Sequence, residues 1–142
     1  MKIILTYDHG GYDLGQQLVD WLQKTHTVIN MGAPSFDAND DFPPLVHRAI
    51  KQMQTEKNPI GIFVCGSGTG VCMTANRTRG IRAALCHSVE YATLARQHND
   101  ANVLCLGGRF VTLARAKKIV SAFLETPFLG GKYATRNKLI DN

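Results

Sequence analysis

The chain lacks the long apolar run that a membrane-spanning helix requires, and its basic residues form no dense cluster. Its 142 residues include 16 Lys and Arg against 11 Asp and Glu, which gives a formal charge of +5. Because the basic residues are scattered and few aromatic residues lie between them, neither a membrane span nor nucleic-acid binding is predicted. A modest positive balance instead suits a small anionic metabolite.

Cysteine pairs at the spacing of common redox and zinc motifs are absent. The four cysteines are Cys65, Cys72, Cys86 and Cys105, and no two of them form a C-x-x-C pair. Cys86 and Cys105 each end an apolar run, so we expect both to be small buried hydrophobic residues. The first residues, MKIILTYDHG, are too short and too soon charged for a signal peptide. We therefore expect a protein of the reducing cytoplasm.

Short apolar runs alternate along the chain with segments of helical spacing. The predicted strands are 2–7, 27–31, 60–64, 81–85 and 102–106, and the predicted helices are 12–24, 43–54, 71–77, 88–97, 112–123 and 132–140. Nearly continuous apolar strands separated by helices are typical of a parallel sheet covered on both faces. We therefore predict one domain over residues 1–142, a three-layer α/β/α sandwich with a five-stranded, Rossmann-like parallel sheet and a C-terminal helical tail.

Three polar clusters fall near the ends of predicted strands. Asp8-His9 follows the first strand, 65–70 follows the third, and His98-Asn99 lies in a polar turn just before the fifth. In a parallel sheet, ligands bind at the carboxyl ends of the strands, near a reversal of strand order. We expect the three clusters to meet at that edge.

The segment 65–70 reads Cys-Gly-Ser-Gly-Thr-Gly and joins a buried strand to a helix. Such a loop offers backbone N–H groups to an anion. A Walker A loop would continue with Lys, but Val71 follows Gly70. A dinucleotide fingerprint would read G-x-G-x-x-G in the first βα unit, and a cysteine phosphatase would place Arg where Val71 stands. An anion-binding loop beside a thiol remains, with no cofactor signature.

The thiol of Cys65 is the leading candidate for chemistry. Its place at a glycine loop and a helix start favours the thiolate form, which acts as a base or a nucleophile, although a purely structural cysteine stays open. Asp8-His9 could instead cap a helix, and His98 could instead interact with a helix dipole. A metal site is not predicted, but Cys65 with His9 or His98 leaves that alternative open.

Three basic residues are candidates for holding a phosphate group: Arg109, Lys132 and Arg136. Lys132 and Arg136 are four residues apart and so share one helix face. A solvated basic face is the alternative interpretation.

These clusters together resemble the ribose-5-phosphate isomerase B / galactose-6-phosphate isomerase family. The matching motifs are YDHGGYDL (7–14), DDFP (40–43), FVCGSGTGVCMTANR (63–77), GIRAALC (80–86), ARQHNDANVLCLGGR (95–109) and GGKYATR (130–136). They extend over essentially the full length. The combination of Cys65 with His98 favours the ribose-5-phosphate isomerase B branch.

The resemblance implies a metal-independent sugar-phosphate isomerase without a cofactor, working as a homodimer or homotetramer whose active site is shared between subunits. Cys65 would be the base that moves a proton between C1 and C2, His98 would assist ring opening, and Ser67 would place a hydroxyl near the sugar oxygens. The other implied substrate contacts are Asp8 and Asn99 for the sugar, the loop Gly66, Ser67, Gly68, Thr69 and Gly70 for the enediolate, and His9, Arg109, Lys132 and Arg136 for phosphate.

Two positions depart from the family pattern. Ser67 stands where threonine is common and keeps the hydroxyl. Lys132 stands where arginine is usual, so it keeps the charge but loses the bidentate fork. We predict interconversion of ribose 5-phosphate and ribulose 5-phosphate through an enediolate. The alternatives are another aldose phosphate (allose 6-phosphate, galactose 6-phosphate or a tetrose phosphate) and a non-catalytic sugar-phosphate-binding subunit.

Overall fold

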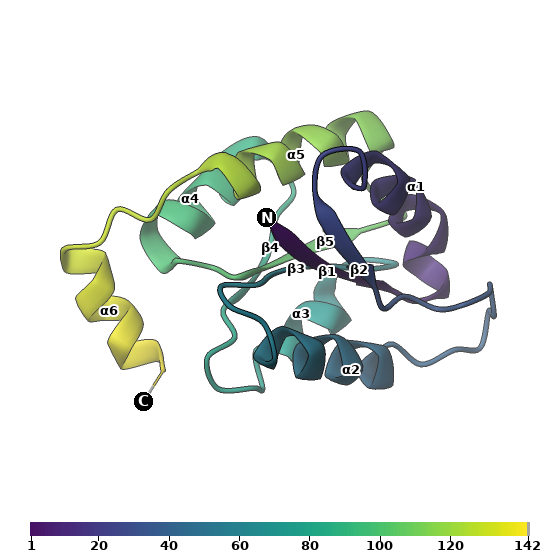
Figure 1. The fold of residues 1–142 in the computed structure, drawn as a ribbon, viewed down its shortest axis with the longest axis horizontal. Coiled ribbons are helices and arrows are strands. Elements are labelled where there is room, and N and C mark those ends of the chain that lie inside the picture. The colour runs from purple at the N-terminus through teal and green to yellow at the C-terminus, as the bar shows by residue number, and fades with distance from the viewer. Residues whose placement is uncertain (142) are drawn as a thin grey trace.

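A parallel sheet forms the centre of the molecule (Figure 1), as the computed structural model of residues 1–141 shows. Its five strands are β1 (Lys2–Tyr7), β2 (Thr27–Asn30), β3 (Ile60–Cys65), β4 (Ala83–Leu85) and β5 (Val103–Gly107). They lie in the order β2-β1-β3-β5-β4, and every neighbouring pair is parallel. The predicted five-stranded parallel sheet is therefore confirmed.

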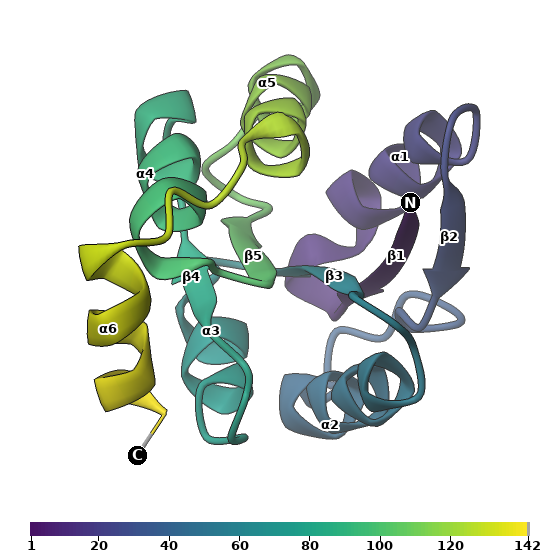
Figure 2. The same cartoon turned by 60° about the vertical axis from the view of Figure 1, so that its left-hand side comes forward.

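Helices cover both faces of the sheet, which confirms the three-layer architecture. The helices are a short 3-10 helix η1 (His9–Gly11), α1 (Tyr12–Leu22), α2 (Phe42–Gln54), α3 (Thr69–Ala75), α4 (Val89–Asn99), α5 (Leu113–Glu125) and α6 (Lys132–Ile140). Helices α1, α4 and α5 lie on one face, and α2 and α3 lie on the other (Figure 2). The last helix, α6, packs beside α4 near the β4 edge.

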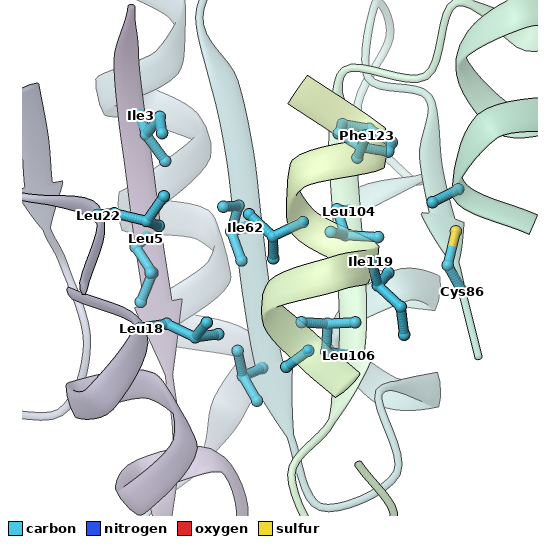
Figure 3. Close-up of a cluster of buried hydrophobic side chains, with 14 of the residues drawn as sticks. Ile3, Leu5, Leu18, Leu22, Ile62, Cys86, Leu104, Leu106, Ile119 and Phe123 are labelled. Carbon is cyan, nitrogen blue, oxygen red and sulfur yellow. The ribbon is translucent and has the colours of Figure 1, made fainter. Parts of the chain in front are cut away.

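The two faces of β3 contribute side chains to two separate hydrophobic cores, because successive side chains of a strand point to opposite sides. Ile62 packs under α5 with Leu104 and Phe123 (Figure 3), whereas Phe63 points to the core under α2 and α3. Each fully buried side chain of this size contributes about 1.5–3 kcal/mol relative to exposure. Cys86 belongs to the first core, which confirms its prediction as a buried hydrophobic residue.

Two helices begin with a capping hydroxyl group. The hydroxyl of Ser88 accepts a hydrogen bond from the Tyr91 N–H, and that of Thr112 accepts one from the Arg115 N–H. These bonds satisfy N–H groups that a helix start otherwise leaves unpaired.

Several element boundaries differ from the prediction. Strand β4 begins at Ala83 instead of 81, because the Ile81 N–H closes a turn onto the Thr78 carbonyl. Helix α3 ends at Ala75 instead of about 77. Helix α4 extends to Asn99 instead of 97, and Asp100 ends it in the left-handed conformation with φ 44°. His98 is therefore part of the last helical turn, not of a loop.

The strand order reverses between β1 and β3, the two central neighbours. After β1 the chain moves to α1 on one face, and after β3 it moves to α3 on the other. Loops that leave adjacent strands in opposite directions open a crevice at their carboxyl ends. In the part of the chain that the structure describes, no helix has the length and apolarity needed to cross a bilayer.

Candidate active site

The crevice between β1 and β3 brings two of the three predicted clusters together. The Asp8 N–H donates to the Val64 carbonyl across the two strands at 3.3 Å. Gly10 approaches the glycine loop so closely that a Cβ on it would lie 2.7 Å from the Gly66 nitrogen. Only glycine allows this contact, which joins the loop after β1 to the loop after β3.

Cys65 ends β3 with a side chain that is 5% exposed. Its sulfur accepts a hydrogen bond from the Gly68 N–H at 3.1 Å. Gly68 lies at φ 80°, and a Cβ there would stand 2.8 Å from the Leu106 carbonyl carbon. The loop can therefore fold back onto the sulfur only with glycine at this position, and the N–H orients the sulfur and can solvate negative charge on it.

The glycine loop has fewer donors to offer a ligand than its sequence implies. The Gly68 N–H is directed at Cys65, and the Thr69 N–H donates to the Ser67 hydroxyl at 3.3 Å. Within residues 1–141, no protein group accepts a hydrogen bond from the N–H groups of Gly66, Ser67 or Gly70. These three donors are the ones that remain for a substrate oxygen.

His9 is held by Asp40, the first residue of the motif DDFP (40–43). The His9 backbone N–H and its Nδ1 both approach Asp40 Oδ1, at 3.0 and 2.6 Å. The hydrogen bond with this carboxylate raises the pKa of His9 above its ordinary value. With Nδ1 engaged, Nε2 is the nitrogen left for a ligand. The motif DDFP includes Asp40, but only the fold brings this residue to His9.

Asp8 is a buried carboxyl group with 4% exposure. Its Oδ1 accepts the Gly11 N–H at 3.0 Å, so the capping role that the sequence left open is present at the start of η1. Burial raises the pKa of Asp8, and the bond from Gly11 opposes that rise.

Arg109 completes this half of the site. Its backbone N–H donates to the Gly66 carbonyl at 3.1 Å, and its guanidinium lies over Gly66, 3.1 Å from where a Cβ would be. Its charge also acts on His9, opposing the rise in that pKa. Two of the four predicted phosphate ligands, His9 and Arg109, are therefore close to each other and to Cys65.

His98 and Asn99 do not join this group, and the prediction that they lie at the same edge is wrong. Helix α4 runs antiparallel to the strands, so its last turn lies at the amino-terminal edge of the sheet, before β5. The five residues of β5 span about 13 Å at about 3.3 Å per residue. Pairing of Cys65 with His98 on one metal ion within one chain is excluded by this separation.

His98, Lys132 and Arg136 instead gather around Tyr133 of α6. The rings of His98 and Tyr133 are stacked, with centroids 4.2 Å apart and planes 9° apart. Lys132 Nζ and Arg136 Cζ lie 5.3 and 5.8 Å from the centroid of the Tyr133 ring. The predicted functional residues thus form two half-sites: Asp8, His9, the loop 65–70 and Arg109 in one, and His98, Asn99, Lys132 and Arg136 in the other.

A charged cluster fastens the second half-site to the sheet. Arg82 pairs with Asp141 at 2.8 Å and with Asp100 at 3.1 Å, and its Nε donates to the Asn99 carbonyl at 2.9 Å. The buried amide of Asn137 on α6 has no hydrogen-bond partner among the described residues.

Asp8, His9 and Asp40 offer ligand atoms within 4.8 Å of one another, a grouping that could hold a metal ion. The sequence did not indicate this triad. Two of its atoms are hydrogen-bonded to each other, and Asp8 Oδ1 is occupied by the Gly11 N–H. The arrangement is therefore already satisfied in part by protein contacts.

Cys72 is half-buried on α3. A hydrogen bond with Cys105 is the main reason that its pKa falls to about 7. Burial raises the pKa of Cys86 to about 12 and that of Cys105 well above its ordinary value.

Known proteins share both the sequence and the fold. The model of the Ribose/Galactose Isomerase family matches residues 3–140. A probable ribose-5-phosphate isomerase B of Mycoplasma pneumoniae is 43% identical over 135 residues, covering 94% of this chain and 89% of that protein. Ribose-5-phosphate isomerase B of Clostridium thermocellum superposes with a TM-score of 0.94 at 39% identity, over 99% and 95% of the two chains. The enzyme of Mycoplasma genitalium, solved with bound ribulose 5-phosphate, gives 0.93 at 41% identity, over 99% and 93%.

Proposed function

The chain belongs to the ribose/galactose isomerase family, and we propose that it interconverts ribose 5-phosphate and ribulose 5-phosphate with Cys65 as the base. The observation that carries the proposal is the Cys65 thiol beside three loop N–H groups that no protein acceptor among the described residues uses. The structure of the M. genitalium relative with ribulose 5-phosphate supports the choice of substrate.

The reaction requires a base and a place for negative charge. The Cys65 thiolate removes the proton from C2 of the open-chain aldose, and the electron pair moves to the carbonyl oxygen on C1. The resulting enediolate oxygen accepts hydrogen bonds from Gly66, Ser67 and Gly70, donors whose positions the loop fixes before the reaction begins. Transfer of the O2 hydroxyl proton to O1, together with return of the abstracted proton to C1, gives the ketose.

A phosphate group supplies binding energy away from the reacting carbons. His9 and Arg109 provide two cations beside Cys65, and the hydrogen bond that His9 donates to Asp40 helps His9 keep its charge. Lys132 and Arg136 provide two more on α6, and His98 assists ring opening.

The two half-sites imply a homodimer, with the site of each chain completed by its partner. Within one chain, Cys65 and His98 lie at opposite edges of the sheet, farther apart than a five-carbon sugar reaches. A second copy related by a two-fold axis would bring its own α4 end and α6 to the crevice, and the same contact repeats for the other site. The whole chain acts as one domain, in the cytoplasm, where its four unpaired thiols are stable.

The direct test incubates the purified protein with ribose 5-phosphate and follows ketose formation, with Cys65→Ala and Cys65→Ser beside the parent. We expect turnover by the parent and a loss of at least about 100-fold in kcat for both variants, the usual contribution of a general base. Full activity of Cys65→Ala would remove the cysteine from the mechanism. Substrate binding without turnover in the parent would favour a non-catalytic binding subunit.

The sugar is tested by comparing kcat/KM for ribose 5-phosphate with that for allose 6-phosphate, galactose 6-phosphate and erythrose 4-phosphate. We expect ribose 5-phosphate to have the highest value. A higher value for a six-carbon sugar would correct the substrate while leaving the reaction type in place.

Metal independence is tested by removing divalent ions. We expect kcat to be unchanged after treatment with EDTA, because the proposed mechanism stabilises charge with N–H groups and side-chain cations alone. Inhibition by EDTA that Mn²⁺ or Zn²⁺ reverses, and that is absent in Asp40→Asn, would show that Asp8, His9 and Asp40 hold a required ion.

A further inference from the structure

Tyr133 contacts three of the four residues of the second half-site, although no sequence pattern indicated a role for it. Its ring is stacked on His98, and the cations of Lys132 and Arg136 lie within 6 Å of its centroid. It stands near the start of α6, opposite the last turn of α4. One half-buried aromatic side chain therefore links the helix that carries His98 to the helix that carries the basic residues.

The stack is the contact that orients the His98 ring. Among the described residues, no group makes a hydrogen bond with either ring nitrogen of His98. Two planes only 9° apart at a centroid distance of 4.2 Å leave the imidazole little room to turn about its Cβ–Cγ bond. Both nitrogens stay available to a substrate while the ring plane stays fixed, which is what a proton-transfer group requires.

We propose that Tyr133 is a positioning residue that holds the His98 imidazole in the orientation needed to open the furanose ring of ribose 5-phosphate. This inference rests on the proposed function, in which His98 assists ring opening. Opening breaks the bond between C1 and the ring oxygen on C4. The C1 hydroxyl gives up its proton, the ring oxygen gains one, and no net proton is consumed.

The chemistry of the two sugars separates this step from the enediolate step. Ribose 5-phosphate enters as a ring, whereas ribulose 5-phosphate cannot close a five-membered ring, because its O5 carries the phosphate and its carbonyl is C2. Exchange of a C1 proton of ribulose 5-phosphate with solvent therefore needs Cys65 and the loop but no ring opening. A defect in His98 orientation must slow turnover of the aldose far more than proton exchange on the ketose.

The experiment compares the full-length parent with Tyr133→Leu, Tyr133→Phe and His98→Asn. Two rates are measured for each: kcat for ribose 5-phosphate, and incorporation of deuterium at C1 of ribulose 5-phosphate in D₂O, followed by NMR. We expect Tyr133→Leu to lose about tenfold or more in kcat, a fraction of the 100-fold or larger contribution of a proton-transfer group. Its deuterium incorporation should stay within about twofold of the parent. Tyr133→Phe keeps the stack and should keep most of both rates.

Three results would overturn the proposal. The first is an equal loss of kcat and of deuterium incorporation in Tyr133→Leu, and the second is a loss of kcat in Tyr133→Phe as large as that in Tyr133→Leu. The third is a selective loss of kcat in His98→Asn without one in Tyr133→Leu. The first would show that Tyr133 only docks α6, and the second that its hydroxyl matters instead of its ring. A parent that performs neither reaction would contradict the proposed function itself, a different outcome. Circular dichroism and thermal midpoints of all four proteins exclude a folding defect as the cause.

Discussion

At the scale of single residues, the charge of the site depends on which side chains the fold places in contact. His9 has Asp40 at 2.6 Å from Nδ1, and this bond raises its pKa above the ordinary 6.5. A histidine whose pKa is raised keeps its charge to higher pH and loses it as pH rises through the new value. Its contribution to folding stability follows the same course, being complete below the ordinary pKa and lost above the raised one.

Replacing Asp40 with Asn should lower the pKa of His9 toward its ordinary value, because the amide oxygen still accepts the hydrogen bond but carries no charge. In the proposed function His9 binds phosphate as a cation, so this charge-assisted bond is then lost at a lower pH. KM for the sugar phosphate should rise about tenfold as pH increases through the pKa of His9. We expect this rise to occur at a lower pH in Asp40→Asn than in the parent. An NMR titration of the His9 ring measures the pKa itself.

Asp41→Asn is the matched control, since Asp41 makes no side-chain capping bond and the substitution removes the same charge one position away. It should leave both the KM profile and the His9 titration near those of the parent. Identical titrations of His9 in Asp40→Asn and the parent would contradict the assignment.

Gly68 connects backbone conformation with chemistry. Its left-handed φ of 80° costs a residue with a Cβ about 1–2 kcal/mol, and an added Cβ would meet the Leu106 backbone at 2.8 Å. Backbone cannot yield as a flexible side chain can, so Gly68→Ala should displace the N–H that is directed at Cys65. We expect a fall of at least about tenfold in kcat together with a lower thermal midpoint, measured on the same preparation.

Gly80→Ala provides the comparison, because Gly80 has φ 82° and nothing within 4 Å of an added Cβ. Both substitutions meet the same left-handed strain, and only Gly68→Ala disturbs the loop. Equal kcat values for the two variants would show that the Gly68 contact to sulfur is not needed for turnover.

At the scale of elements, the sequence predicted what depends on local pattern. The strands around Ile4, Ile62 and Leu104 are continuous apolar runs, and the capping hydroxyls of Ser88 and Thr112 directly precede helices. The direction in which an element runs also follows from the alternation of strands and helices. That reasoning places the end of α4 at the amino-terminal edge, and so it corrects the expected position of His98.

Side-chain contacts between different elements could not be predicted from the sequence pattern. Asp40 lies 31 residues from His9, and nothing in the polar composition of its loop distinguishes it from Asp41. Tyr133 reads as one more residue of a basic helix until the fold places it on His98. In both cases the sequence indicates the histidine, His9 or His98, but not the residue that holds it, because tertiary packing sets the pairing.

Helix α6 is attached mainly by polar and stacking contacts. Among the described residues, neither hydrophobic core includes a side chain from it, and Arg82 ties its end to the sheet through Asp141. Such an element can loosen while the rest of the domain stays folded. The Arg82–Asp141 pair therefore affects the placement of Lys132 and Arg136 more than it affects global stability.

We expect Asp141→Asn to raise KM for ribose 5-phosphate about two- to fivefold, with the thermal midpoint lowered by only a few degrees, since a partly exposed ion pair contributes about 0.2–1 kcal/mol. Steady-state kinetics and thermal unfolding on one sample test both parts. Asp20→Asn removes an exposed carboxylate on α1 and should change neither. A large fall in thermal midpoint with KM unchanged would show that α6 supports the fold and not the substrate.

At the scale of the whole molecule, the proposed dimer joins two half-sites that lie at opposite edges of one sheet. Two-fold symmetry would place the Cys65 of one subunit beside the His98 of the other, twice in each dimer. Two variants with defects in different half-sites can then complement each other, because a mixed dimer carries both defects in one site and none in the other.

Cys65→Ala and His98→Asn, each with greatly reduced activity alone, should therefore regain activity when their subunits are exchanged by joint refolding. Half of the dimers are mixed and half of their sites are intact, so about a quarter of the parent activity should return.

The reciprocal mixture joins the parent with the double variant Cys65→Ala/His98→Asn in equal amounts. Shared sites reduce its activity to about a quarter, because every site of a mixed dimer then carries one defect, whereas sites confined to one chain leave about a half. No recovery in the first mixture and a half in the second would place each complete site within a single chain, and would overturn the shared site.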